Sequence, residues 1–85
     1  MSLVEKIKEA MKKNRIVYGY REVIKFIRNN KVEIVILANN APEKVKKMIL
    51  NSNVPVEIFN GGSKEIGTIC GKPYPISVIA VKAEG

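Results

Sequence analysis

The segment Val32–Ala38 constrains the fold more than any other stretch of the chain. From Ile34 to Ala38 every side chain is apolar, with no alternation between apolar and polar positions. A strand with one face in water alternates between the two kinds of residue, whereas a strand covered on both faces has a continuous apolar run. The sequence therefore predicts that this segment is a central strand of a sheet with both faces covered.

Segments of helical and strand character alternate along the whole chain. We predict, in order, a helix capped by Ser2, a strand at 16–18, a helix at 20–28, a strand at 32–38, a helix whose first turn holds Pro42, a strand at 54–59, a helix at 64–70 capped by Ser63, and a strand at 76–81. This alternation is typical of an α/β sandwich, in which one sheet has helices on both faces. Pro55 cannot donate a ladder hydrogen bond, so its strand is expected near a sheet edge. We expect one small domain spanning residues 1–85.

Charge gives the first indication of function. Fifteen Lys and Arg residues oppose eight acidic residues, all of them Glu, for a formal net charge of +7. A small domain this basic is biased towards a polyanionic partner such as nucleic acid. Lysine-rich surfaces also serve solubility, so the charge alone leaves both interpretations open.

The chain lacks the residues that most catalytic centres need. His and Asp are absent, which excludes Ser-His-Asp and Cys-His arrangements and the usual transition-metal clusters. Gly67–Lys72 is similar to a phosphate-binding loop, but three residues separate its glycines where four are needed, and Pro73 takes the Ser/Thr position. Cys70 is interpreted as a small buried hydrophobe. We therefore predict a protein that is not an enzyme and has no cofactor or metal.

Location can also be predicted from the sequence. No apolar run approaches the roughly 20 residues of a transmembrane helix, and the first residues lack the apolar segment of a signal peptide. A single cysteine cannot form an internal disulfide. We expect a cytoplasmic protein that does not enter a membrane.

Two connections between predicted elements carry candidate binding residues. Gly19 stands at a strand-to-helix turn, where the absence of a side chain lets a ligand backbone approach closely. Arg21 and Lys25 recur on one face of the helix that follows, whose N-terminus offers free N–H groups to a phosphate. Asn39 and Asn40 follow the central strand, where their amides either make the turn or read base edges. An ordinary solvated basic helix face is the alternative interpretation of the cations.

The loop Gly71-Lys72-Pro73-Tyr74-Pro75 is the third candidate. Its two prolines fix φ and remove hydrogen-bond donors, so the loop is stiff. A stiff loop that offers one cation and one aromatic ring suits an unpaired base beside a phosphate. In the alternative interpretation the loop is a tight helix-to-strand connection, and Tyr74 covers the edge of the core.

These same segments resemble the ribosomal protein L30e family of the L7Ae superfamily. The matching motifs, in order, are Gly19–Lys25 (GYREVIK), Ala38–Pro42 (ANNAP), Phe59–Thr68 (FNGGSKEIGT) and Gly71–Tyr74 (GKPY). The resemblance spans nearly the whole chain, and the EIGT run with the GKPY loop is its most specific part. It implies a three-layer α-β-α sandwich with a four-stranded mixed sheet, and loops at one end that grip a sharply bent RNA, the kink-turn.

Carried over by position, the resemblance also implies an RNA-binding site. Its residues are Gly19, Tyr20, Arg21, Glu22, Lys25, Asn39, Asn40, Lys72 and Tyr74. Gly19 would allow the RNA backbone to approach, Lys72 would meet phosphate and Tyr74 would place its ring against a splayed base. Arg21 stands where the guide-RNA branch of the superfamily has Asn, which argues against guide-RNA scaffolding.

The leading hypothesis is a single RNA-binding domain of the large ribosomal subunit that recognises a kink-turn or similar bent internal loop of ribosomal RNA. The first alternative is a kink-turn protein of another particle, such as a guide-RNA complex or a tRNA-processing ribonuclease. A remoter alternative is a small anion- or nucleotide-binding domain that uses the turn at Gly61 and Gly62.

Overall fold

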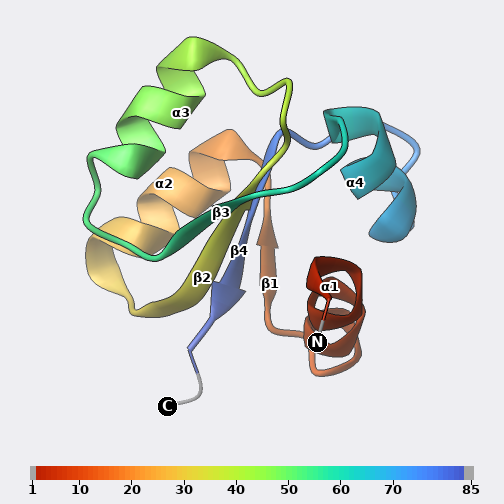
Figure 1. Ribbon diagram of the computed structural model, residues 1–85. Coiled ribbons are helices and arrows are strands. Elements are labelled where there is room, and N and C mark those ends of the chain that lie inside the picture. Colours follow the sequence, from red (N-terminus) through yellow and green to blue (C-terminus); the bar gives the residue numbers. More distant parts are fainter. Residues whose placement is uncertain (1, 84–85) are drawn as a thin grey trace.

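The computed structural model describes residues 2–83, which form helices and strands in strict alternation (Figure 1). The elements are α1 (Leu3–Lys12), β1 (Ile16–Tyr18), α2 (Tyr20–Asn29), β2 (Val32–Leu37), α3 (Glu43–Leu50), β3 (Val56–Ile58), α4 (Ser63–Ile69) and β4 (Val78–Lys82). The order and type of every predicted element are confirmed. Ser2 also caps α1 as predicted, because its side chain accepts a hydrogen bond from the backbone N–H of Glu5.

The four strands form one mixed sheet in the order β1-β4-β2-β3. Strand β4 pairs antiparallel with both β1 and β2, whereas β2 and β3 are parallel. The prediction that the strand around Ile34–Ala38 is central is confirmed, since β2 lies between β4 and β3. The strand that follows Pro55 lies at an edge, also as predicted, where a residue without an N–H interrupts no inner ladder.

Helices cover both faces of this sheet, which confirms the three-layer sandwich. On one face, α1 and α4 pack on Ile34 and Ile36 of β2 and on Ile79 of β4. On the other face, α2 and α3 pack on Val35 and Leu37 of β2. Figure 1 shows these helix pairs on opposite sides of the sheet. Successive residues of β2 point to opposite faces, so a wholly apolar strand is needed to supply both cores.

Several element ends differ from the prediction. Strand β3 begins only at Val56, because Pro55 has no N–H with which to extend the ladder. Strand β4 begins at Val78, because the N–H of Ile76 bonds to the carbonyl of Ser63 and not to another strand. Pro42 is the N-cap of α3 and precedes its first turn.

The N-terminus of α4 corrects the expectation that Ser63 is its cap. Gly62 is the N-cap residue, and Ser63 is the first residue of the helix. The backbone N–H of Ser63 donates a hydrogen bond of 2.9 Å to Oδ1 of Asn40, which lies in the β2–α3 connection. A side chain that is distant in the sequence therefore accepts a hydrogen bond from one of the N–H groups that the first turn of a helix leaves without an intrahelical partner.

The C-terminus of α4 sets the path of the loop that follows. Gly71 has φ of +70°, the left-handed conformation that ends many helices at glycine. The N–H of Lys72 bonds to the carbonyl of Gly67, and that of Gly71 bonds to the carbonyl of Thr68, which is the Schellman pattern. The loop then passes so near α4 that a Cβ at Gly67 would lie 2.2 Å from the carbonyl oxygen of Tyr74.

Gly67 is therefore expected to be intolerant of even one added methyl group. Gly67→Ala should lower the free energy of unfolding by about 2 kcal/mol, because overpacking against a backbone atom costs up to about 3 kcal/mol and the gain in helix propensity is only about 1 kcal/mol. Urea denaturation measures the difference. Thr68→Ala, on the exposed side of the same helix, is the control and should change stability by less than about 0.5 kcal/mol. A Gly67→Ala protein as stable as the wild type would show that the loop does not press on α4.

Candidate nucleic-acid interface

Strand directions bring four connections to one end of the sheet. Strands β1, β2 and β3 all run the same way, because β1 and β2 are both antiparallel to β4 and β3 is parallel to β2. The segments that follow β1, β2 and β3 therefore meet the segment that precedes β4 (Figure 1). We call this end the tip, defined as Gly19 and residues 38–42, 59–62 and 70–77.

Backbone hydrogen bonds join these segments into one surface. Gly19 donates to the carbonyl of Val78 at 3.1 Å, and Ala38 donates to the carbonyl of Ser77 at 2.9 Å. Asn39 donates to the carbonyl of Gly61, also at 2.9 Å. Because each bond links segments far apart in the sequence, the tip is a continuation of the sheet and not a set of independent loops.

Gly19 is required by its backbone conformation. Its φ of +87° and ψ of 156° lie in a region that is almost restricted to glycine. Apart from Gly19 itself and its neighbours in the chain, no described protein atom lies within 4 Å of the position that a Cβ would take, so the space beside Gly19 is open. No side chain caps the helix that begins here. The expectation that a ligand backbone can approach Gly19 is consistent with this geometry.

Asn39 and Asn40 both lie exposed at the tip but have different structural roles. Asn40 caps α4 through its side chain, whereas Asn39 is held by its backbone alone. The carbonyl of Asn39 accepts a hydrogen bond of 3.2 Å from Nζ of Lys46 in α3. That contact brings a cation to the tip. It could not be predicted, because nothing in the sequence spacing distinguishes Lys46 from Lys44 or Lys47.

The α4–β4 loop presents Tyr74 and Lys72 in different ways. Tyr74 is 53% exposed, so its ring is available to a partner. Lys72 is partly buried, and its Nζ lies 4.7 Å from the centroid of the Tyr18 ring at the end of β1. A cation over an aromatic face at this distance is a cation–π contact. Lys72 is thus held against strand β1 beside Gly19.

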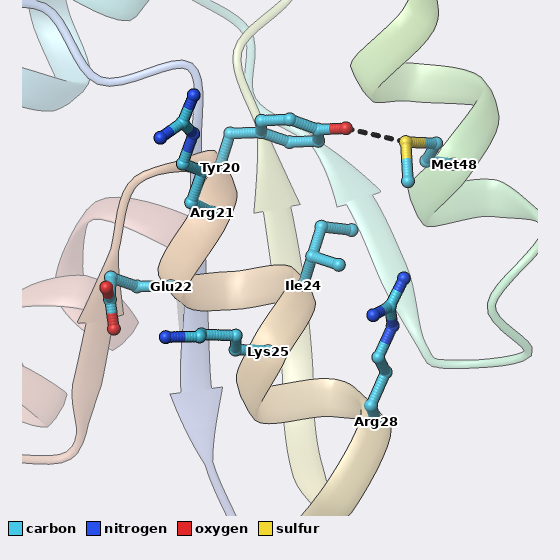
Figure 2. A pocket seen from close by; sticks show the side chains of 7 residues that line it. All are labelled: Tyr20, Arg21, Glu22, Ile24, Lys25, Arg28 and Met48. Atoms are coloured by element: carbon cyan, nitrogen blue, oxygen red, sulfur yellow. Dashed lines mark hydrogen bonds between the residues drawn. The ribbon is translucent and has the colours of Figure 1, made fainter.

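Helix α2 carries the remaining predicted residues, which line an open pocket of about 530 Å³ together with Met48 of α3 (Figure 2). Arg21, Glu22 and Lys25 are exposed on α2. Tyr20, in contrast, reaches towards α3, where its hydroxyl donates a hydrogen bond to Sδ of Met48. Its phenol therefore links two helices, which sequence spacing did not indicate.

The chemistry of this end suits binding better than catalysis. Burial raises the pKa of the Cys70 thiol, and the nearby Lys72 ammonium offsets this only in part. A thiol with a raised pKa stays protonated near neutrality and is a poor nucleophile. Within residues 2–83 no group of three or more His, Cys, Asp or Glu residues is placed to hold a metal ion. Over the same range, no helix is both long and apolar enough to cross a membrane.

The structure therefore brings most of the predicted site together. Gly19, Asn39, Asn40, Lys72 and Tyr74 lie at the tip, and Arg21 leaves it from the first turn of α2. Glu22 and Lys25 extend the same region along the helix. Two further residues lie beside this site and were not predicted to belong to it. Tyr18 falls in the predicted strand at 16–18 and immediately precedes Gly19, and Lys46 contacts Asn39 from α3.

Comparison with curated proteins identifies relatives along most of the chain. An archaeal large ribosomal subunit protein eL30 from Sulfurisphaera tokodaii is 38% identical, over 88% of this chain and 74% of that protein. The eL30 of Methanosphaera stadtmanae is 34% identical over 100% of this chain and 91% of its own length. Such relatives are named as ribosomal proteins, which confirms the prediction that the chain is not an enzyme.

Solved structures share the same fold. A Bacillus halodurans protein described as having unknown function superposes with a TM-score of 0.78 and 30% identity, covering 89% of this chain and 79% of that one. The Giardia lamblia 15.5 kD RNA binding protein superposes with a TM-score of 0.79 at 23% identity, covering 96% and 72% of the two chains. The second likeness concerns the fold alone.

A family model confirms the resemblance found in the sequence motifs. The match covers residues 1–85, the whole chain. It agrees with the identities to the archaeal eL30 proteins and with the mixed four-stranded sheet. The chain therefore belongs to the ribosomal protein L7Ae/L30e/S12e/Gadd45 family.

Proposed function

We propose that the protein is a single RNA-binding domain of the large ribosomal subunit, acting in the cytoplasm and bound to ribosomal RNA. The eL30 relatives, which align along most of the chain, support the ribosomal assignment. The formal charge of +7 supports binding to a polyanion, because Lys and Arg that neutralise phosphates release counterions from RNA.

The observation that carries the proposal is the convergence of four connections on one hydrogen-bonded tip. We propose that this tip recognises a kink-turn or a similar bent internal loop. Sequence-specific proteins read RNA mainly where bases are unstacked and splayed, since the major groove of an A-form helix is too narrow for side chains. A rigid tip with an open glycine, exposed amides, a fixed cation and an exposed ring has complementary chemistry for such a loop.

Each predicted residue has a role in this proposal that matches its placement. The open space beside Gly19 admits the RNA backbone, and Arg21 and Lys25 contact phosphates from α2. Glu22 accepts hydrogen bonds from base amino groups. Tyr20, whose hydroxyl bonds to Met48, contributes its backbone and ring edge.

The other predicted residues lie in two segments of the tip, residues 38–42 and 70–77. Asn39 and Asn40 read base edges, Lys72 meets a phosphate, and Tyr74 stacks on a splayed base. These contacts come from connections that backbone bonds hold together, so the RNA must supply a bent shape that reaches them all.

Association with ribosomes tests the first part of the proposal. The tagged protein should sediment with large ribosomal subunits in a sucrose gradient and leave them at high salt, because phosphate contacts weaken steeply as salt rises. Sequencing of the RNA that co-purifies distinguishes the alternatives. Recovery of guide RNAs or ribonuclease RNA without ribosomal RNA would assign the protein to another particle.

Preference for bent RNA tests the second part. In a mobility-shift titration, a kink-turn duplex should bind at least about tenfold more tightly than a straight duplex of the same length. The straight duplex offers the same phosphates but no splayed bases, so it retains only the non-specific electrostatic term. Equal affinity for the two duplexes would contradict shape recognition at the tip.

Tyr74 should contribute through its ring alone. Tyr74→Ala is expected to weaken binding to the bent RNA by about 1–3 kcal/mol, the usual value of one base stacked on an aromatic side chain. Tyr74→Phe keeps the ring and should bind as the wild type does. Because the Tyr74 side chain is 53% exposed, the thermal midpoint of the alanine variant should stay near that of the wild type. Unchanged affinity in the alanine variant would remove Tyr74 from the site.

A further inference from the structure

Tyr18 is a residue that neither the sequence motifs nor the family resemblance assigns to the site. It is the last residue of β1, paired with Ile79 of β4 and directly before Gly19. Its ring is partly buried and packs at the edge of the core under α1 and α4. In the alternative interpretation, Tyr18 only fills the edge of the core. That interpretation does not predict a contact between its ring and a charged group.

The Tyr18 ring does contact a charged group, because the Lys72 ammonium lies 4.7 Å from the centre of the ring. Burial raises the pKa of Tyr18 most, and the adjacent Cys70 thiol and Tyr74 phenol raise it further. The phenol of Tyr18 is therefore neutral at physiological pH. The Tyr18 ring thus adjoins Lys72, one of the two predicted RNA contacts of the α4–β4 loop.

Lys72 is fixed at both of its ends. Its backbone N–H bonds to the carbonyl of Gly67 at 2.8 Å, which sets the start of the loop. Its ammonium is held over the ring. Lysine side chains have many rotamers, and ordering one on binding opposes association. A lysine that is already ordered in the free protein avoids this loss and offers its charge at a defined point of the tip.

We propose that Tyr18 is a positioning residue, which holds the Lys72 ammonium at the tip so that it meets an RNA phosphate. An ammonium carries three N–H groups; the ring faces one side of it, and the other side is left for phosphate oxygens. This inference rests on the proposed function and adds a residue and a mechanism to it. In this role Tyr18 affects RNA binding only through Lys72 and does not itself contact the RNA.

The contact is tested first in the free protein. In a ¹H–¹³C spectrum, the Hε protons of Lys72 should be shifted upfield by the ring current in the wild type and in Tyr18→Phe. The shift should disappear in Tyr18→Leu, which keeps an apolar side chain but has no ring. Ordinary lysine Hε shifts in the wild type would overturn the proposal without any RNA measurement.

The consequence is tested with the bent RNA. Tyr18→Leu should weaken binding about two- to fivefold, the value of one exposed cation–π contact, whereas Tyr18→Phe should bind like the wild type. Lys72→Met should weaken binding and lower the salt dependence by about one phosphate contact. Lys31→Ala is the matched control, because Lys31 precedes β2 and so lies at the opposite end of the sheet. It should leave binding to the bent RNA unchanged.

The decisive comparison is Tyr18→Leu in the Lys72→Met background. If Tyr18 acts through Lys72, the second substitution should cause no further loss of affinity, since coupled residues give non-additive effects. An equal loss in both backgrounds would show that Tyr18 acts by another route. If the wild type shows no preference for bent RNA, the proposed function fails and the RNA role of Tyr18 fails with it, while the Lys72 proton shifts still report whether the contact exists.

Discussion

The antiparallel pairing of β4 with both β1 and β2 is the interaction on which the arrangement of this molecule depends. It orients β1 and β2 the same way although they are not neighbours, and the parallel pairing of β3 extends that orientation to the edge. Every connection that leaves these strands then meets the segment entering β4. If β4 ran in the opposite direction, the glycine at 19 and the loop at 71–77 would lie at opposite ends of the sheet, and no common surface would form.

The same pairing also connects the segments of the tip to one another. Val78 and Ser77 accept hydrogen bonds from Gly19 and Ala38, so the sheet continues past the formal strand ends. On the other side of the loop, the absence of a side chain at Gly67 lets α4 press against the backbone of Tyr74. The proposed recognition of a bent RNA requires a surface that keeps its shape on binding, and these contacts connect the tip through backbone atoms.

Much of this organisation could be predicted from the sequence, because it depends on local patterns. The apolar run at Ile34–Ala38 predicts a strand covered on both faces, and Pro55 predicts an edge. Glycines and prolines mark the connections, and the motifs identify the family. Contacts between distant segments could not be predicted in this way. Nothing near Ser63 indicates that Asn40 caps its helix, and nothing near Tyr18 indicates that Lys72 lies over its ring.

In the candidate site, too, residue types could be predicted from the sequence, whereas contacts between distant segments could not. Single positions such as Gly19 and Tyr74 follow from residue type, since glycine permits unusual φ and an exposed ring favours stacking. The residues that the site residues contact within the protein do not follow from residue type. Tyr20 is predicted to contact RNA, but the bond of its hydroxyl to Met48 could not be predicted, because the distance between α2 and α3 is set by tertiary packing. Lys46 reaches Asn39 for the same reason.

The capping contact of Asn40 also fixes what its side chain can recognise. The atom that receives the Ser63 N–H must be the amide oxygen, because only an acceptor can pair with a donor. An amide turned the other way would leave that helix N–H unpaired, so the orientation of the side chain is set and its NH₂ group can only donate. In the proposed interface, Asn40 would therefore favour the ring nitrogens and carbonyl oxygens of a base over its exocyclic amines.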